Sequence, residues 1–228
     1  MRDNLYIVAS SKSWNSLIYD DLKVSSTGRW VYVENPAELH NALCGSIPRY
    51  IFFLHWNWIV PETIWHEHEC VCFHMTDLPY GRGGSPLQNL ILTGHTESKL
   101  TALRMIQEMD AGPIYSKRPL PLNGSAEEIY VRASKLSVEL IRWIIKDNPQ
   151  PIPQEGKVII FKRRKPEQSN LPVNGGLMTA YDFIRMLDAD GYPNAFVEHG
   201  DYRINFKNAR FDNEHVFAEV EIKLKNKS

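Results

Sequence analysis

The sequence is poor in cysteine and has no long apolar run. Its three cysteines, Cys44, Cys70 and Cys72, are an odd number without the spacing of a disulfide framework, which is typical of a reducing compartment. No apolar stretch is long enough to span a membrane, and the apolar run near the N-terminus is too short for a secretion signal. We therefore expect a cytoplasmic protein without a membrane partner, whose fold depends on packing.

An excess of charge of one sign is also absent. The chain has 26 lysine and arginine residues against 27 aspartate and glutamate residues. No overall positive field is therefore available to neutralise phosphates, which disfavours a tRNA substrate, and we expect no nucleic-acid partner. The length of 228 residues allows a main domain with a buried core and a small appendage.

Short apolar runs alternate with polar, helix-like stretches in the first third of the chain. Runs of this length between polar turns predict buried parallel strands joined by crossover helices, such as one at residues 36–43. The predicted strands are residues 5–8, 30–33, 50–54 and 71–73. A doubly wound α/β sheet follows, and its ligand crevice lies at the carboxyl ends of the strands. Function is therefore expected in residues 74–86, which follow the fourth strand.

The later sequence predicts a long helix, a strand and a second module. Ser125 and Glu128 form a capping box that opens a helix with apolar residues at helical spacing: Ile129, Ala133, Leu136, Leu140 and Ile144. Residues 156–161 predict a late strand. A module near Gly175 predicts one helix and three strands, at 179–187, 195–197, 202–206 and 216–222. We expect an α/β core over residues 1–174 and a small α+β module over 175–228.

Two motifs in residues 73–114 suggest a family. His74 at a strand end is followed by a Leu-Pro loop and Arg-Gly, and Asp110 begins the sequence Asp-Ala-Gly-Pro-Ile 36 positions later. This pattern and spacing resemble the folate-dependent formyltransferases, in which such a histidine and aspartate meet in the active site. The resemblance implies a formyltransferase-type Rossmann-like core, N10-formyltetrahydrofolate as cofactor, and catalytic roles for His74 and Asp110.

Other segments narrow the resemblance to the sugar N-formyltransferases. Residues 53–61 resemble their folate-side loop, and residues 161–169 resemble their Arg-Arg segment. The sequence of residues 74–91 looks most like that of the formyltransferase of the pseudaminic-acid pathway. The implied acceptor is a nucleotide-linked amino sugar, UDP-4-amino-4,6-dideoxy-N-acetyl-altrosamine, and the implied assembly is a homodimer. The implied folate-binding residues are Trp56, Asn57, Trp58, Ile59 and Asp110; core packing is the alternative for the two tryptophans.

Histidine and carboxylate suit the chemistry of formyl transfer. The reaction needs an amine nucleophile, stabilisation of an oxyanion and a proton for the leaving nitrogen. His74 can donate to the oxyanion or take the amine's proton, and Asp110 can orient the imidazole or accept that proton. The alternative is that His74 only caps a strand and Asp110 only begins a turn.

Further residues are candidates for binding the acceptor. The glycine-flanked Arg82 suits a diphosphate, although a plain glycine turn is equally consistent with the sequence. Gln88 and Asn89 either bind substrate or begin the next helix, and the basic run at 162–165 either meets a nucleotide diphosphate or is a solvated charge run. The predicted acceptor set is Met75, Thr76, Arg82, Gly83, Gln88, Asn89, Arg163 and Arg164.

Cys72 stands where the family usually has an asparagine that donates to the formyl oxygen. A thiol is a weak donor and does not replace an amide in an oxyanion site. Three interpretations remain open: another donor such as Asn57 or a backbone amide takes over, His74 carries the oxyanion with water, or the catalyst is weaker. We predict that Cys72 is not a nucleophile, because its apolar neighbours Val71 and Phe73 supply no positive charge.

Two other classes of function fit parts of the sequence. His66, His68, Cys70 and Cys72 alternate as on one strand face and offer zinc ligands, but residues along one straight strand are too far apart to close a tetrahedron. The catalytic assignment therefore includes no metal. With cysteine at position 72, the chain also fits a non-catalytic protein that binds sugar nucleotide or folate. Methionyl-tRNA formylation is opposed by the neutral charge and the brief C-terminal module.

Overall fold

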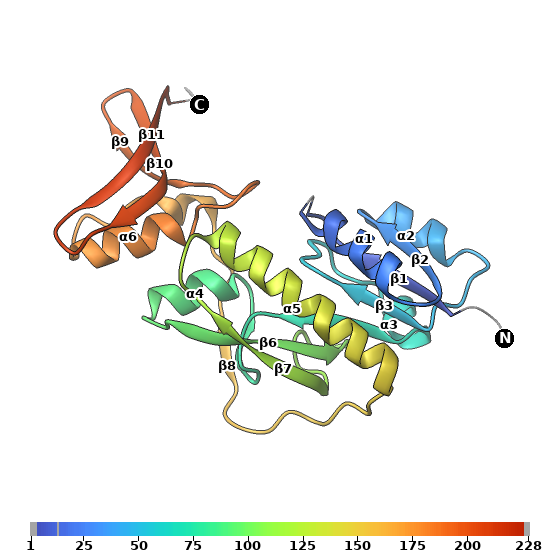
Figure 1. Ribbon diagram of the computed structural model, residues 1–228. Helices are drawn as coiled ribbons and strands as arrows, with labels where there is room; N and C mark the ends of the chain where they lie inside the picture. The colour runs from blue at the N-terminus through green and yellow to red at the C-terminus, as the bar shows by residue number, and fades with distance from the viewer. Residues whose placement is uncertain (1–3, 13, 226–228) are drawn as a thin grey trace. The chain divides into compact units, whose positions relative to one another are not determined.

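The fold is an α/β core followed by a smaller antiparallel module. The computed structural model describes residues 4–12 and 14–225 (Figure 1). A six-stranded sheet has the order β2-β1-β3-β4-β6-β7, a three-stranded sheet has the order β11-β10-β9, and β5 pairs with β8. The strands are β1 (Leu5–Ala9), β2 (Arg29–Val33), β3 (Tyr50–Phe53), β4 (Cys70–His74), β5 (Tyr80–Gly83), β6 (Glu97–Arg104), β7 (Ile114–Pro121), β8 (Ile159–Phe161), β9 (Ala195–His199), β10 (Tyr202–Phe211) and β11 (Val216–Leu224).

The helices lie between these strands as crossover connections and covers. They are α1 (Asn15–Ser25), α2 (Pro36–Leu43), α3 (Glu62–Glu67), α4 (Pro86–Leu92), α5 (Ala126–Asp147), α6 (Leu177–Arg185) and the short 3-10 helix η1 (Pro166–Ser169). Helix α2 begins where the sequence specifies it, because Asn35 Oδ1 accepts from the Glu38 amide at 3.0 Å and Pro36 occupies the first turn. The α/β fold class predicted from the sequence is confirmed.

The four predicted core strands form one parallel set. β1 pairs in parallel with β2 and with β3, and β3 pairs in parallel with β4. Their carboxyl ends therefore meet at one edge of the sheet, where residues 74–86 begin. Strand β6, which the sequence pattern does not indicate, pairs antiparallel with β4 and places Thr101 opposite His74.

Both faces of the central strand β1 are buried, as expected for a parallel sheet with helices on each side. One face joins alternate residues of neighbouring strands into a cluster that includes Leu5, Ile7 and Ala9 of β1 together with Ile51 and Phe53 of β3. Each fully buried side chain of this size stabilises the fold by about 1.5–3 kcal/mol through removal of apolar surface from water. This cluster gives the sheet edge a rigid base.

The strand expected to carry four metal ligands is interrupted by a helix. His66 lies in α3 and His68 is its C-terminal capping residue, so only Cys70 and Cys72 lie on β4. The prediction of alternate ligands on one strand face is wrong, because Pro61 and Glu62 start a helical turn directly before β4. Among the described residues, no three histidine, cysteine, aspartate or glutamate side chains are grouped to hold a metal ion.

Helix α5 begins with the predicted capping box. The Glu128 amide donates to Ser125 Oγ at 3.3 Å, and Glu128 Oε2 accepts from the Ser125 amide at 2.8 Å. The predicted apolar positions Ile129, Ala133 and Leu140 are fully buried. In residues 4–12 and 14–225, no helix combines the length and apolar character needed to cross a membrane.

The chain forms two compact units. The first comprises the described residues up to Gly83 with 99–120 and 131–160, and the second comprises 84–98, 121–130 and the described residues from Phe161 onward. The predicted second module has its helix as α6 and its three strands as β9–β11, joined antiparallel. These units are interleaved along the sequence, and the boundary at 174/175 stays a prediction.

Truncation of a core side chain is expected to destabilise the fold strongly. Ile7 is fully buried in β1, so Ile7→Ala should lower the free energy of unfolding by about 2–5 kcal/mol. The matched control is Ile47→Ala, because Ile47 is 86% exposed and its truncation should change little. Urea unfolding followed by circular dichroism measures both; equal effects of the two variants would contradict the core assignment.

Candidate functional site

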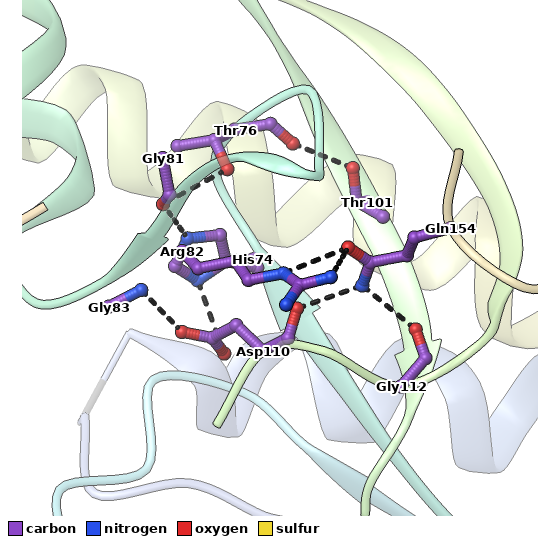
Figure 2. Close-up of polar contacts among 9 residues, drawn as sticks. All are labelled: His74, Thr76, Gly81, Arg82, Gly83, Thr101, Asp110, Gly112 and Gln154. Atoms are coloured by element: carbon purple, nitrogen blue, oxygen red, sulfur yellow. Dashed lines mark hydrogen bonds and ion pairs between the residues drawn. The ribbon is translucent and has the colours of Figure 1, made fainter. Parts of the chain in front are cut away.

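His74 is held at the carboxyl end of β4 by a single defined contact. Its Nε2 lies 2.8 Å from the carbonyl oxygen of Gly81, and its side chain is 9% exposed (Figure 2). A carbonyl oxygen only accepts hydrogen bonds, so Nε2 carries a hydrogen and donates it. The Nδ1 atom is therefore the only ring nitrogen of His74 that can gain or lose a proton without breaking this contact.

Asp110 lies beside His74 on the turn between β6 and β7. Its Oδ2 accepts from the Gly83 amide at 2.9 Å, and its Oδ1 lies 3.6 Å from His74 Nδ1. The aspartate has the left-handed backbone conformation, with φ of 55°, which Asp tolerates better than most residues. The sequence prediction that His74 and Asp110 come together agrees with this geometry, and their catalytic roles stay a prediction.

The glycine of the Asp-Ala-Gly motif, Gly112, is required for steric reasons. A Cβ atom built on Gly112 would lie 1.8 Å from the carbonyl oxygen of Arg104, the last residue of β6. No side chain fits there without moving the backbone. The close approach of the two backbones therefore sets where the Asp110 turn sits on the sheet.

The distance between His74 and Asp110 has a chemical meaning. A separation of 3.6 Å between Nδ1 and Oδ1 is longer than a hydrogen bond. Since Nε2 holds its hydrogen against Gly81, a neutral His74 presents a lone pair at Nδ1 to the lone pairs of the carboxylate. His74 Nδ1 and Asp110 Oδ1 are thus two acceptors close to each other. A group with two hydrogens to donate, such as an amine, can form a hydrogen bond with each.

Cys72 lies on the same strand as His74 and is a protonated thiol. Burial raises the pKa of Cys72 above its ordinary value, and the negative charge of Asp110 raises it further. The thiolate is the reactive form of cysteine, so this environment opposes nucleophilic attack by Cys72. The physical cause differs from that given by the sequence, which considered only the apolar neighbours.

The predicted folate-side loop follows β3 and presents aromatic surface. Trp56 packs on the core cluster and contacts Phe53 edge-on at 5.7 Å between ring centroids, whereas Trp58 is 44% exposed and stands edge-on to Trp56 at 4.9 Å. Ile59 is 87% exposed and Asn57 is exposed. Core packing thus describes Trp56, while Trp58 and Ile59 leave apolar surface exposed, and the assignment of this loop to folate stays a prediction.

His55 lies within the predicted loop, but the sequence gives it no role of its own. Its φ is 50°, and Asn15 Nδ2 lies 3.3 Å from His55 Nδ1. Burial lowers the pKa of His55 to about 4, and the positive charge of Lys12 lowers it further. A neutral His55 therefore accepts from Asn15 and ties the loop to the start of α1; no spacing in the sequence signals this contact.

The predicted acceptor residues of the first unit are differently placed. Met75 is buried and Thr76 is fully buried, with Thr76 Oγ1 donating to Gly81 and its carbonyl accepting from Thr101 (Figure 2). These contacts make Thr76 part of the frame below His74. The Arg82 guanidinium donates to Glu108 and Gln154, and the Gly83 amide donates to Asp110, so only Gly83 contacts the aspartate directly.

The predicted acceptor residues of the second unit have partners within that unit. Gln88 donates both amide hydrogens, to Tyr130 Oη and to the Met186 carbonyl, each at 3.0 Å. Asn89 donates to the carbonyls of Gly84, Ser85 and Lys162. These contacts favour the alternative that Gln88 and Asn89 shape helix α4, and their assignment to the acceptor stays a prediction.

The two arginines of the basic run differ from each other. Arg163 is exposed, and its Cβ lies 2.5 Å from where a Cβ of Gly84 would be, so that glycine makes room for it. Arg164 is partly buried over the Phe183 ring and donates to the Gln168 carbonyl, and burial lowers its pKa. Only Arg163 therefore fits the description of a solvated charge, and neither residue is tested as an acceptor ligand.

The similarity of this chain to a solved protein extends over its whole length. A methionyl-tRNA formyltransferase from Clostridium thermocellum is 43% identical, with a TM-score of 0.93, and the match covers 97% of this chain and 100% of that one. The chain belongs to the formyltransferase family. The family model for the C-terminal domain of methionyl-tRNA formyltransferase matches residues 166–223 of this formyltransferase.

More distant relatives of this formyltransferase carry two different names. A methionyl-tRNA formyltransferase from Bacteroides thetaiotaomicron is 26% identical over 153 residues, which are 61% of this chain and 47% of the relative. This formyltransferase spans about half the length of the curated relatives it matches. A sugar N-formyltransferase from a Shewanella species shares the fold, with a TM-score of 0.69 and 19% identity over 90% of this chain and 96% of that one.

The protonated state of Cys72 is open to a direct chemical test. Because burial and Asp110 raise the pKa of Cys72, iodoacetamide at about pH 8 should alkylate exposed Cys44 readily and Cys72 slowly in the folded protein. Replacing the charge with Asp110→Asn should speed alkylation of Cys72. Peptide mass spectrometry follows each site separately, and rapid modification of Cys72 in the folded wild type would contradict this account.

Proposed function

We propose that this formyltransferase transfers a formyl group from N10-formyltetrahydrofolate to the primary amine of a nucleotide-linked amino sugar. The observation that carries the proposal is the geometry of the His74–Asp110 pair. His74 Nδ1 and Asp110 Oδ1 are two hydrogen-bond acceptors 3.6 Å apart at the carboxyl edge of the sheet. A transferred acyl group needs an attacking amine and a site for the proton that this amine loses. The substrate supplies the amine, and the pair supplies two acceptors that orient it and a site for its proton.

The proposed roles follow from the fixed tautomer of His74. The amine donates hydrogens toward Nδ1 and toward Oδ1, which orients its lone pair away from the two side chains. As the nitrogen attacks and becomes positive, His74 takes its proton at Nδ1 while Nε2 stays on Gly81. The imidazolium then lies beside the Asp110 carboxylate, whose negative charge stabilises it, because both side chains are largely buried. His74 then gives this proton to the folate nitrogen, which leaves as its bond to the formyl carbon breaks.

The proposed cofactor site uses the loop after β3. N10-formyltetrahydrofolate, which formyltransferases of this kind use, supplies the formyl group. Trp58 and Ile59 offer exposed apolar surface for its ring system, Asn57 offers hydrogen-bond donors and acceptors, and Trp56 supports the loop from below. Asp110 faces the reacting end.

The missing asparagine has a proposed substitute. Cys72 is a weak donor, but the hydrogen that His74 receives at Nδ1 gives the site a charged donor during the reaction. This assigns one residue the two tasks of accepting a proton and stabilising negative charge. Of the three interpretations left open by the sequence, this geometry favours the one in which His74 takes over.

The proposed acceptor rests on a sequence resemblance and on the net charge. We infer a UDP-linked 4-amino-4,6-dideoxy-N-acetyl-altrosamine of pseudaminic acid biosynthesis, because the wording of residues 74–91 resembles that enzyme and the net charge of −1 provides no general attraction for tRNA. A cytoplasmic location and a homodimer belong to the same proposal.

Methionyl-tRNA is a second candidate acceptor, and a specific observation favours it. The 43% identical structure from Clostridium thermocellum is named a methionyl-tRNA formyltransferase, and residues 166–223 match the C-terminal domain of that family. The net charge favours an amino sugar as acceptor, whereas the names of these relatives favour methionyl-tRNA. An assay of both acceptors distinguishes the two.

An acceptor screen separates these candidates. The purified protein is incubated with N10-formyltetrahydrofolate and, in separate reactions, UDP- and dTDP-linked amino sugars or methionyl-tRNA, and each acceptor is examined by mass spectrometry for the gain of one formyl group. We expect formylation of an amino sugar and none of methionyl-tRNA. Formylation of methionyl-tRNA alone would refute the sugar assignment, and no formylation of any acceptor would refute catalysis.

Removal of either member of the pair should abolish turnover while the fold persists. His74→Gln and Asp110→Asn should each lower kcat by about 10²–10⁴-fold, because proton transfer at Nδ1 or stabilisation of the imidazolium is lost. The controls are His40→Gln and Asp20→Asn, since both residues are exposed on helices. Circular dichroism checks folding, and a kcat near wild type in either site variant would sink the assignment.

A further inference from the structure

Gln154 contacts the backbone of the Asp110 turn from outside the motif. Its Nε2 donates to the carbonyl oxygens of Asp110 and Gly112, each at 2.8 Å (Figure 2). Both hydrogens of the amide are thus used on the two sides of one turn. The turn needs such support, because Asp110 has a positive φ and Gly112 is pressed against the carbonyl of Arg104.

Arg82 holds the other end of the same amide. Gln154 Oε1 accepts from Arg82 Nε at 3.1 Å and from Arg82 Nη2 at 2.9 Å, a bidentate contact that fixes the plane of the amide. Arg82 Nη1 binds Glu108 at 2.9 Å, two residues before the aspartate. The arginine side chain is only 13% exposed, whereas that of Glu108 is 71% exposed, so Gln154 is the partly buried partner of Arg82.

These contacts close into a ring around Asp110. The ring runs from the Asp110 carbonyl through Gln154 to the Arg82 side chain, and through the backbone of Arg82 to the Gly83 amide, which donates to Asp110 Oδ2 at 2.9 Å. Both the backbone and the carboxylate of Asp110 are therefore held by one connected support formed by Gln154, Arg82 and Gly83. The orientation of Oδ1 toward His74 depends on this ring.

We propose that Gln154 is a positioning residue for formyl transfer and that Arg82 acts through it, holding Asp110 in register with His74. This inference rests on the proposed function, and it replaces the earlier prediction that Arg82 binds the acceptor. The two assignments for Arg82 have different consequences. An acceptor ligand contributes to KM, whereas a support for Asp110 contributes to kcat.

Three substitutions isolate the contacts. Gln154→Met keeps the length of the side chain and removes all its hydrogen bonds. Gln154→Glu keeps an acceptor for Arg82 but places a carboxylate oxygen against the two carbonyls of the turn, so it removes only the Asp110 side of the ring. The matched control is Gln150→Met, because Gln150 is exposed on the same connecting segment.

The first measurement uses the protein without substrates. Hydrogen exchange of the Gly83 amide, followed by NMR, reports the bond from this amide to Asp110 Oδ2. We expect exchange at least about tenfold faster in Gln154→Met and Gln154→Glu, and unchanged in Gln150→Met. The ring 15N resonances of His74 should shift in the same two variants. Unchanged Gly83 exchange and unchanged His74 resonances would overturn the structural part of the proposal.

The second measurement uses turnover with the acceptor that the screen identifies. Gln154→Met and Gln154→Glu should each lower kcat by about 10–100-fold with little change in KM, because a small displacement of Asp110 affects the transition state more than binding. Arg82→Met should lower kcat similarly, and Arg82→Met combined with Gln154→Met should be no worse than the more severe single variant.

The outcomes distinguish this proposal from the proposed function. An inactive wild type that still shows fast Gly83 exchange in the variants would refute formyl transfer and leave the ring intact. An active wild type whose kcat is insensitive to Gln154 would refute the positioning role alone. A raised acceptor KM in Arg82→Met, additive with Gln154→Met, would return Arg82 to the acceptor site and overturn the inference.

Discussion

The hydrogen bond from His74 Nε2 to the Gly81 carbonyl is the constraint on which the site depends. It fixes the tautomer of the imidazole and therefore determines which nitrogen faces Asp110. The carbonyl is itself positioned by the frame of Thr76 and Thr101, both fully buried. A histidine free to rotate would offer either nitrogen, and the two acceptors would not converge on one region.

Much of the fold and the central pair were predictable from the sequence. The strand ends around β1, β2, β3 and β4 are specified by short apolar runs, and α2 by Asn35 and Pro36. His74 and Asp110 were identified because a strand end and an Asp-Ala-Gly turn carry local signals. In the structure His74 Nδ1 and Asp110 Oδ1 lie 3.6 Å apart, and the catalytic roles of the two residues stay a prediction.

The remainder was not predictable, because it depends on contacts between distant segments. Gln154 lies among prolines without any periodic pattern and reaches Asp110 only through the folded chain. His66 and His68 alternate with the cysteines in sequence, but a helical turn after Pro61 separates them from β4. Gln88 has the composition of a ligand residue, yet both of its hydrogens stay within the protein. Local pattern does not distinguish a polar group that binds a ligand from one that completes the fold.

Strand β6 positions both His74 and Asp110. Thr101 of β6 pairs with His74 of β4, and three residues later the carbonyl of Arg104 meets Gly112 so closely that no side chain fits. Contacts with this one strand thus set the positions of both the histidine and the aspartate. Inserting or deleting a single residue between positions 101 and 112 would reverse the faces of the strand or displace the Asp110 turn. Changes in chain length are therefore better tolerated in loops that do not contact β6.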